Sequence, residues 1–242
     1  MKICLAQIAP HRGNVQKNME IHKKWIERAI HEQADLIAFP ELSLTGYEPQ
    51  KSKALAFSEH DERLDLFKQL SDTYKITIAI GVPTTSKTGI HISMFIFQPQ
   101  QERKLYSKQH LHVDELPFFT PGTEQLIFKV SHTTIAPAIC FESLQKEHAE
   151  NAFGLGAAIY LASVAKSETG MKKAYTHYPK IAQKHAFPVA CVNNIGFCDN
   201  FYGAGQSAIW NGKGDLIAAL SKDQEGLLLY DFENHSIRII EV

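Results

Sequence analysis

Short apolar runs that alternate with helical segments limit the fold of this chain more than any other feature. The run DLIAFPE (35–41) is continuously apolar up to Pro40, which is typical of a strand that is buried on both faces and ends at a loop. Three later runs also predict strands, namely TTIAPAIC (133–140), AAIYLAS (157–163) and PVACVNN (188–194). Strands separated by helices indicate an α/β protein.

The remaining elements follow from the spacing of apolar residues and from turn signals. Asn14 stands where a helix N-cap belongs, and helices are predicted over 15–33, 62–74, 145–154 and 171–187. Further strands are predicted in MKICLAQIAP (1–10) and over 76–82 and 91–97. The last forty residues change to short strands joined by Gly and Asn turns. Two facing sheets with helices outside would accommodate these hairpins, in a single domain over 1–242.

Charge and composition exclude several classes of function. The formal net charge is -1, with both signs interspersed, which argues against nucleic-acid and anionic-membrane partners and favours a small neutral or mixed-charge ligand. We expect a soluble, cytoplasmic protein, because no apolar run approaches the ~18 residues of a membrane span and the N-terminus lacks a secretory apolar region. The four cysteines form no C-x-x-C pair and the twelve histidines follow no zinc pattern, so neither a disulfide framework nor a metal or other cofactor is expected.

Cys140 is the first candidate for chemistry, because it ends a strand just before a helix-like segment. Backbone N–H groups at such a turn can stabilise an oxyanion, by ~3 kcal/mol per donor. A thiol with a pKa of about 8.5 is mostly protonated at pH 7, so a catalytic cysteine needs a base or a cation beside it. Glu41 and Lys108 stand at comparable positions. Taken singly, a buried thiol, a solvated acid and a surface lysine are the simpler interpretations.

Four segments together resemble the signature blocks of the nitrilase superfamily of carbon–nitrogen hydrolases, in particular its aliphatic amidase and omega-amidase-like branch. They are FPELSLTGY (39–47), YSKQHL (106–111), ELPFFTPG (115–122) and APAICFES (136–143), and the similarity continues through VNNIG (192–196) and 203–220. Four short motifs in order are far more specific than one. The resemblance implies a four-layer α-β-β-α sandwich with two mixed sheets, which pairs through its helical faces into a homodimer or higher homo-oligomer.

The same resemblance implies a role for each matching residue. Cys140 corresponds to the nucleophile, Glu41 to the general base and Lys108 to the residue that stabilises the oxyanion. Glu115 corresponds to a second glutamate that orients the lysine, and the backbone N–H of Phe141 to the second oxyanion donor. Since the base is then a carboxylate, none of the histidines should be essential for acylation.

Residues for substrate contact are suggested more weakly by their neighbourhood. Tyr47, Phe119, Glu142 and Ser163 are candidates, with core packing an equal alternative for the aromatic residues, Phe118 among them. The segment 162–178, with Lys166 and Glu168, is expected to shape the pocket. Many family members carry Arg-Ala-x-Glu-Asn where this chain has Ile181-Ala182-Gln183-Lys184-His185, so packing or a subunit contact there should differ.

The expected activity is hydrolysis of small linear amides through a Cys140 thioester. A glutaminase or omega-amidase is an alternative, because two of the segments also resemble the glutaminase portion of glutamine-dependent NAD synthetases. An N-carbamoyl amidohydrolase, a nitrile hydrolase and an N-acyltransferase would use the same thioester, and a non-catalytic binding protein could keep the same scaffold.

Overall fold

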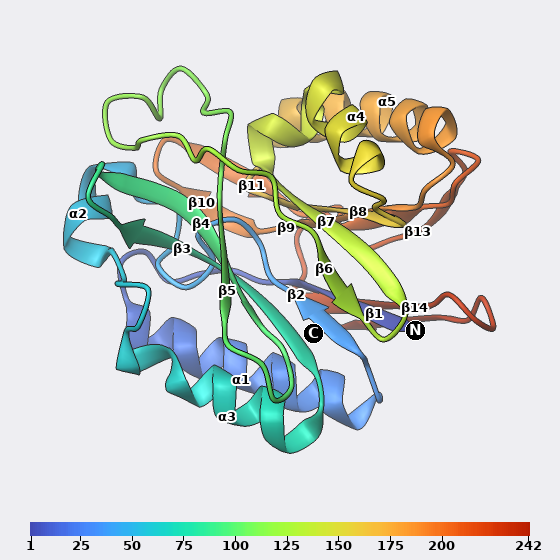
Figure 1. The fold of residues 1–242 in the computed structure, drawn as a ribbon, viewed down its shortest axis with the longest axis horizontal. Coiled ribbons are helices and arrows are strands. Elements are labelled where there is room, and N and C mark those ends of the chain that lie inside the picture. Colours follow the sequence, from blue (N-terminus) through green and yellow to red (C-terminus); the bar gives the residue numbers. More distant parts are fainter.

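Two mixed β-sheets face each other in the computed structural model, which describes all of residues 1–242 (Figure 1). The first sheet has the strand order β15-β14-β1-β2-β3-β4-β5, and only the pairs β1–β2 and β2–β3 are parallel. Its strands are β1 (Lys2–Gln7), β2 (Leu36–Ala38), β3 (Thr77–Thr85), β4 (Ile90–Phe97), β5 (Lys104–Ser107), β14 (Gly226–Asp231) and β15 (Ile237–Glu241).

The second sheet has the order β13-β12-β9-β8-β7-β6, with β7, β8 and β9 parallel to one another. Its strands are β6 (Phe128–Val130), β7 (Thr133–Ile139), β8 (Ile159–Val164), β9 (Val189–Asn193), β12 (Ala208–Trp210) and β13 (Leu216–Ala219). A separate hairpin consists of β10 (Ile195–Cys198) and β11 (Phe201–Ala204).

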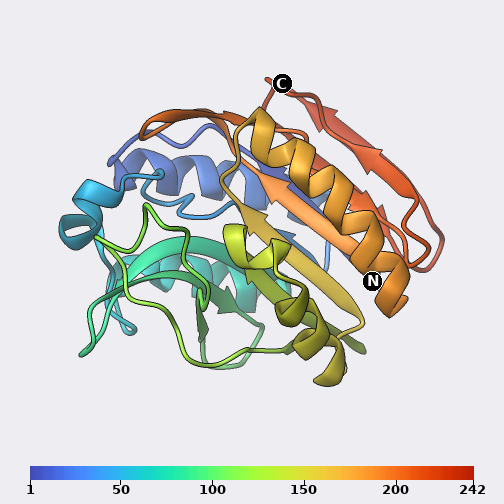
Figure 2. The ribbon, with the colours of Figure 1, turned by 90° about the horizontal axis from the view of Figure 1, so that it is seen from above.

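Helices cover the outer face of each sheet. The first sheet packs against α1 (Val15–His31) and α3 (Asp65–Tyr74), and the second against α4 (Lys146–Gly154) and α5 (Glu168–His185), which lie side by side in Figure 2. Shorter elements are η1 (Pro49–Lys51), α2 (Ser52–Leu55), η2 (Glu62–Leu64) and η3 (Cys140–Leu144). A central core between the sheets and two outer cores under the helices give the four-layer α-β-β-α sandwich that was predicted.

Local signals located most helix ends correctly. The Asn14 side chain accepts a hydrogen bond from Lys17 N at 3.1 Å and caps α1, as predicted. In contrast, α5 begins at Glu168, three residues before the expected start, because the Ser167 hydroxyl caps it. None of the helices is long and apolar enough to cross a membrane. Pairing of two copies through the helical faces stays a prediction, as does the single domain.

The closing hairpins are divided between the two sheets. β12 and β13 extend the second sheet, whereas β14 and β15 join the first, where β14 pairs antiparallel with β1 from Lys2↔Asp231 to Gln7↔Gly226. The last strands therefore extend both sheets. Of the strands that precede the site residues, β2 and β7 are interior, whereas β5 is the edge strand of the first sheet.

Candidate active site

The three predicted catalytic residues follow three different strands and meet between the sheets. Glu41 lies three residues after β2, Lys108 comes directly after β5, and Cys140 comes directly after β7. Gly81 of β3 holds the Glu41 loop close, since a Cβ there would lie 2.4 Å from the Pro40 carbonyl oxygen and 2.5 Å from Leu42 N. Only glycine allows that approach, and the loop is thereby pressed against the first sheet.

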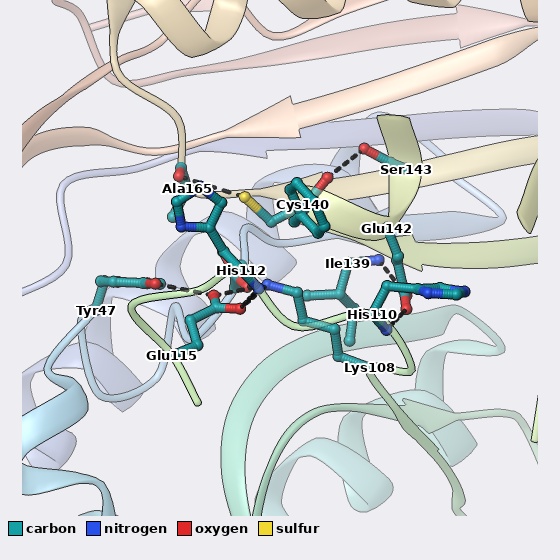
Figure 3. A network of polar contacts seen from close by, with 12 residues as sticks. Tyr47, Lys108, His110, His112, Glu115, Ile139, Cys140, Glu142, Ser143 and Ala165 are labelled. Atoms are coloured by element: carbon teal, nitrogen blue, oxygen red, sulfur yellow. Dashed lines mark hydrogen bonds and ion pairs between the residues drawn. The ribbon is translucent and has the colours of Figure 1, made fainter. Parts of the chain in front are cut away.

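Lys108 lies between two carboxylates in a fully buried cluster. Its Nζ donates to Glu41 Oε1 at 2.8 Å and to both oxygens of Glu115 at 2.7 and 2.8 Å. Glu115 also accepts from the Tyr47 hydroxyl at 2.9 Å and from the His112 backbone N–H at 2.7 Å (Figure 3). Every oxygen of Glu115 is therefore occupied, and the lysine is fixed in one position.

Glu41 differs from Glu115 because one of its carboxylate oxygens has no hydrogen-bond partner. Its Oε2 is buried and has no hydrogen-bond partner, whereas Oε1 is held by Lys108. Burial raises the pKa of Glu41, while the positive charge of Lys108 opposes the shift. Burial also acts to lower the pKa of Lys108, but the negative charges around it outweigh burial and the net change is upward. The site thus joins a permanent cation to a carboxylate that takes up a proton more readily than a solvated one.

Cys140 occupies a strained turn between β7 and the first turn of η3. Its φ of 48° lies in the left-handed region, which costs a non-glycine residue about 1–2 kcal/mol. The first N–H groups of a helix have no acceptor within the helix, and Phe141 N belongs to this first turn. Burial raises the pKa of the Cys140 thiol to about 11, and the charge of Glu41 acts in the same direction. The resting residue is therefore a thiol, and only its deprotonated form would be a strong nucleophile.

A cavity of about 320 Å³ opens above Cys140. Its lining combines apolar, cationic and acidic side chains from the loops that follow β2, β5 and β8, from η3 and α5, and from β11. These residues are Tyr47, His112, Asp114, Glu115, Cys140, Phe141, Leu144, Ala165, Lys166, Ser167, Gly170, Lys173 and Phe201. Glu41 and Lys108 lie behind this lining, with exposed fractions of 1% and 0%.

Three of the four residues suggested for substrate contact lie elsewhere, which corrects that expectation. Glu142 is fully buried and accepts hydrogen bonds on both oxygens, from Tyr106, Ile139, Gln109 and His110. The Ser163 hydroxyl donates to the Phe39 carbonyl at 2.8 Å, and Phe119 packs in the central core. Only Tyr47 of this set lines the cavity.

The segment 162–178 does line the cavity, but only in part. Lys166 reaches the cavity, whereas Glu168 does not. Phe118, in the loop after Lys108, does not line the cavity either. The unusual stretch Ile181–His185 ends α5 away from the cavity, and Lys184 there pairs with Glu150 of α4.

Several lining residues were missed from the sequence. His112 and Asp114 could have been found, because they lie between Lys108 and Glu115 and share their loop. Phe201 has no local signal, since the β10–β11 hairpin brings its ring 5.5 Å from that of Tyr47.

Comparisons with known proteins agree with this geometry. Residues 2–239 match the protein family described as Carbon-nitrogen hydrolase. The chain therefore belongs to the carbon–nitrogen hydrolase family, and it is an enzyme of the nitrilase superfamily.

Relatives among curated proteins are of two kinds. The glutamine-dependent NAD(+) synthetase of Acinetobacter baylyi is 27% identical over 96% of this chain, and a probable nitrilase of Schizosaccharomyces pombe is 23% identical over 94% of it. The alignments cover 44% of the synthetase and 87% of the nitrilase. The chain thus spans less than half the length of the first curated relatives that it matches.

The fold is that of solved amidase structures. The amidase NitN from Nesterenkonia sp. AN1 superposes with a TM-score of 0.88 at 20% identity, over 97% of this chain and 93% of that one. A cysteine-to-alanine variant of that amidase has been solved in complex with butyramide. A glutamine-dependent NAD+ synthetase from Acinetobacter baumannii superposes with a TM-score of 0.84 at 21% identity, over all of this chain and 47% of that one.

Proposed function

We propose that this enzyme hydrolyses small linear amides, with Cys140 as nucleophile, Glu41 as base and Lys108 with the Phe141 N–H as oxyanion donors. The observation that carries the proposal is the unpaired Oε2 of Glu41, which is buried in the cluster that also holds Lys108 Nζ. A free carboxylate oxygen in a dry site has room for one proton, and the neighbouring thiol has one to give.

The reaction follows from these positions. Glu41 takes the proton of the Cys140 thiol, and the resulting thiolate sulfur forms a bond to the amide carbon. The negative charge moves to the carbonyl oxygen, between the Lys108 ammonium and the Phe141 N–H. Glu41 returns the proton to the nitrogen, the C–N bond breaks, and ammonia or an amine leaves a thioester on Cys140. Water then attacks the thioester carbon while Glu41 takes one of its protons. The C–S bond breaks, the electron pair returns to sulfur, and the carboxylic acid product leaves. Glu41 finally returns its proton to the Cys140 sulfur, which restores the thiol and the carboxylate.

The size of the cavity favours a small substrate. Its volume of about 320 Å³ lies at the lower end of the range for ligand pockets, roughly 300–1,000 Å³. Tyr47, Phe141 and Phe201 supply apolar surface, and the charged residues among the lining leave room for a polar end group. A short amide fits these walls better than an extended peptide.

The test is ammonia release from a panel of amides by the wild type and by Cys140→Ala. We expect turnover to fall at least about 10⁴-fold in the variant, because the nucleophile is lost. Hydroxylamine should intercept the thioester as a hydroxamate with the wild type alone. Wild-type turnover by Cys140→Ala, together with no acyl adduct on the wild type by intact-mass spectrometry, would refute the proposal.

Glutamine or a related amide with a carboxylate is a second candidate substrate. It is supported by the similarity to glutamine-dependent NAD(+) synthetases and by Lys173, a cation in the cavity lining that forms no ion pair and could hold a carboxylate. A comparison of kcat/KM for glutamine, an N-carbamoyl amino acid and butyramide decides between the substrates. A preference for butyramide that Lys173→Met leaves unchanged would exclude this candidate.

A further inference from the structure

Lys166 is a second lysine at Cys140, and the fold holds it firmly in place. It lies between the end of β8 and the N-cap of α5. The buried side chain of Asn193 accepts from Lys166 N at 2.9 Å and donates to Lys166 O at 3.0 Å. Ala204 N donates to the same carbonyl at 2.9 Å. The backbone of Lys166 is therefore tied to both β9 and β11.

The side chain of Lys166 packs against α5 at Gly170. A Cβ on Gly170 would lie 3.0 Å from Lys166 Cβ and 3.4 Å from Cγ, so the glycine leaves space for the lysine stem. Glycine inside a helix costs about 1 kcal/mol relative to alanine. The stem then runs to the floor of the cavity, and only 6% of the residue is exposed.

The ammonium of Lys166 ends at the reacting sulfur. Its Nζ donates to the Cys140 carbonyl at 3.2 Å and lies 3.7 Å from Cys140 Sγ. Unlike Lys108, it forms no ion pair with a carboxylate. An almost buried cation without a counter-ion is unfavourable, so an anion that forms beside it is stabilised.

We infer that Lys166 is a catalytic residue that stabilises the thiolate of Cys140, a role that rests on Cys140 being the nucleophile of the proposed function. The thiolate arises when the Cys140 proton moves to Glu41. It arises again when the C–S bond of the thioester breaks and the electron pair returns to sulfur. In both steps Lys166 acts through its charge and transfers no group. Lys108 stabilises the negative charge on the oxyanion, and Lys166 stabilises the negative charge on the sulfur.

The electrostatic surroundings of Cys140 agree with this division. Burial and then the charge of Glu41 raise the pKa of the thiol, and Lys166 is the strongest influence that lowers it, ahead of Lys108. The charge of Glu115 also raises the pKa of the thiol. These four residues are the charged groups that act on the sulfur.

The experiment measures how fast iodoacetamide alkylates Cys140 between pH 6 and 11, with the modified peptide identified by mass spectrometry. We compare the wild type with Lys166→Met, which keeps the stem, and Lys166→Arg, which keeps the charge. Lys166→Gln keeps a donor for the Cys140 carbonyl without the charge. Lys172→Met is the matched control, because it removes a lysine of α5 that pairs with Glu168 at 3.3 Å outside the cavity.

We expect Lys166→Met and Lys166→Gln to be alkylated about tenfold more slowly on the acidic limb, which corresponds to a thiol pKa about one unit higher. Lys166→Arg and Lys172→Met should follow the wild type. The inference is overturned if folded Lys166→Met and Lys166→Gln keep the wild-type alkylation rate on this limb, even with a raised KM, or if Lys172→Met slows alkylation equally. Alkylation needs no amide turnover, so this test can fail while the enzyme proves to be an amidase, and it can succeed if no amide of the panel is cleaved.

Discussion

Two buried carboxylate clusters lie on either side of the Lys108 loop, and they differ in how completely their oxygens are used. In the first, Glu41 has one oxygen on Lys108 and one without a partner. In the second, Glu142 accepts from Tyr106 at 2.6 Å and Ile139 N at 2.7 Å on one oxygen, and from Gln109 N at 2.7 Å on the other. Buried polar groups are normally satisfied, and of these two carboxylates only Glu41 has an oxygen that is free to accept a proton.

The second cluster connects the two sheets beneath the site. The Tyr106 hydroxyl of β5 contacts His148 Nε2 of α4 at 2.9 Å, and His148 Nδ1 contacts the Tyr160 hydroxyl of β8 at 2.7 Å. Burial lowers the pKa of His148 to about 4, so this network is neutral at His148 at pH 7. It contains no cation and does not open to the cavity. The comparison predicts that the first cluster supports chemistry and the second supports the fold.

Glu41→Gln should give the largest effect. The amide retains an oxygen for Lys108 but cannot take a proton, and a general base contributes roughly 10²–10⁴ to the rate. We expect kcat to fall about 10³-fold while the free energy of unfolding changes by less than about 1 kcal/mol. Steady-state kinetics and urea unfolding measure the two quantities on the same sample. Turnover within tenfold of the wild type would remove Glu41 from the role of base.

Glu142→Gln should show the opposite pattern, with a large effect on stability. Its NH₂ group would face the N–H groups of Gln109 and His110, and each buried group that loses its partner costs about 1–3 kcal/mol. We expect the free energy of unfolding to fall by about 2–4 kcal/mol, and kcat of the folded enzyme to change by less than about tenfold. A variant as stable as the wild type but inactive would reverse the assignment of the two clusters.

The pH dependence of this stability difference tests the same carboxylate. Burial raises the pKa of Glu142 to about 7 from its ordinary value of 4.5. The folded protein therefore binds more protons than the unfolded chain between these values, and its stability falls as pH rises through this window. Glutamine does not titrate, so the advantage of the wild type over Glu142→Gln should shrink by roughly 3 kcal/mol from pH 4.5 to pH 8. Parallel stability curves for the two proteins would contradict the raised pKa.

The sequence predicted the first cluster better than the second. Glu41 and Cys140 each end a predicted strand, Lys108 was expected at a comparable position, and the order of four motifs related the three residues to one another. Glu142 was assigned to the pocket because it lies two residues after Cys140. Within η3, however, its side chain turns back to Ile139 N and the Lys108 loop. Adjacency along the chain does not give the direction of a side chain in a tight turn.

The fold shows the same division between local and distant information. Apolar periodicity predicted most of the strands and helices up to β9, though not the short β5 and β6, and the order of the elements together with the closing hairpins indicated two facing sheets. The sequence patterns could not predict that β14 would pair with β1, or that Phe201 would reach the cavity on the β10–β11 hairpin. These contacts join residues far apart in the sequence, and they depend on packing of the whole molecule.

His112→Ala should give the smallest effect, although His112 lines the cavity beside Glu115. Its backbone N–H holds Glu115, while its ring contacts Asp114 at 2.5 Å and the Phe141 ring at a centroid distance of 5.2 Å. The substitution keeps the backbone contact and removes only the imidazole. We expect kcat to stay within about threefold of the wild type, since the proposed base is the carboxylate of Glu41. A loss of 100-fold, with the acidic limb of the pH–rate profile abolished, would instead make the imidazole the base and leave the free oxygen of Glu41 without a function.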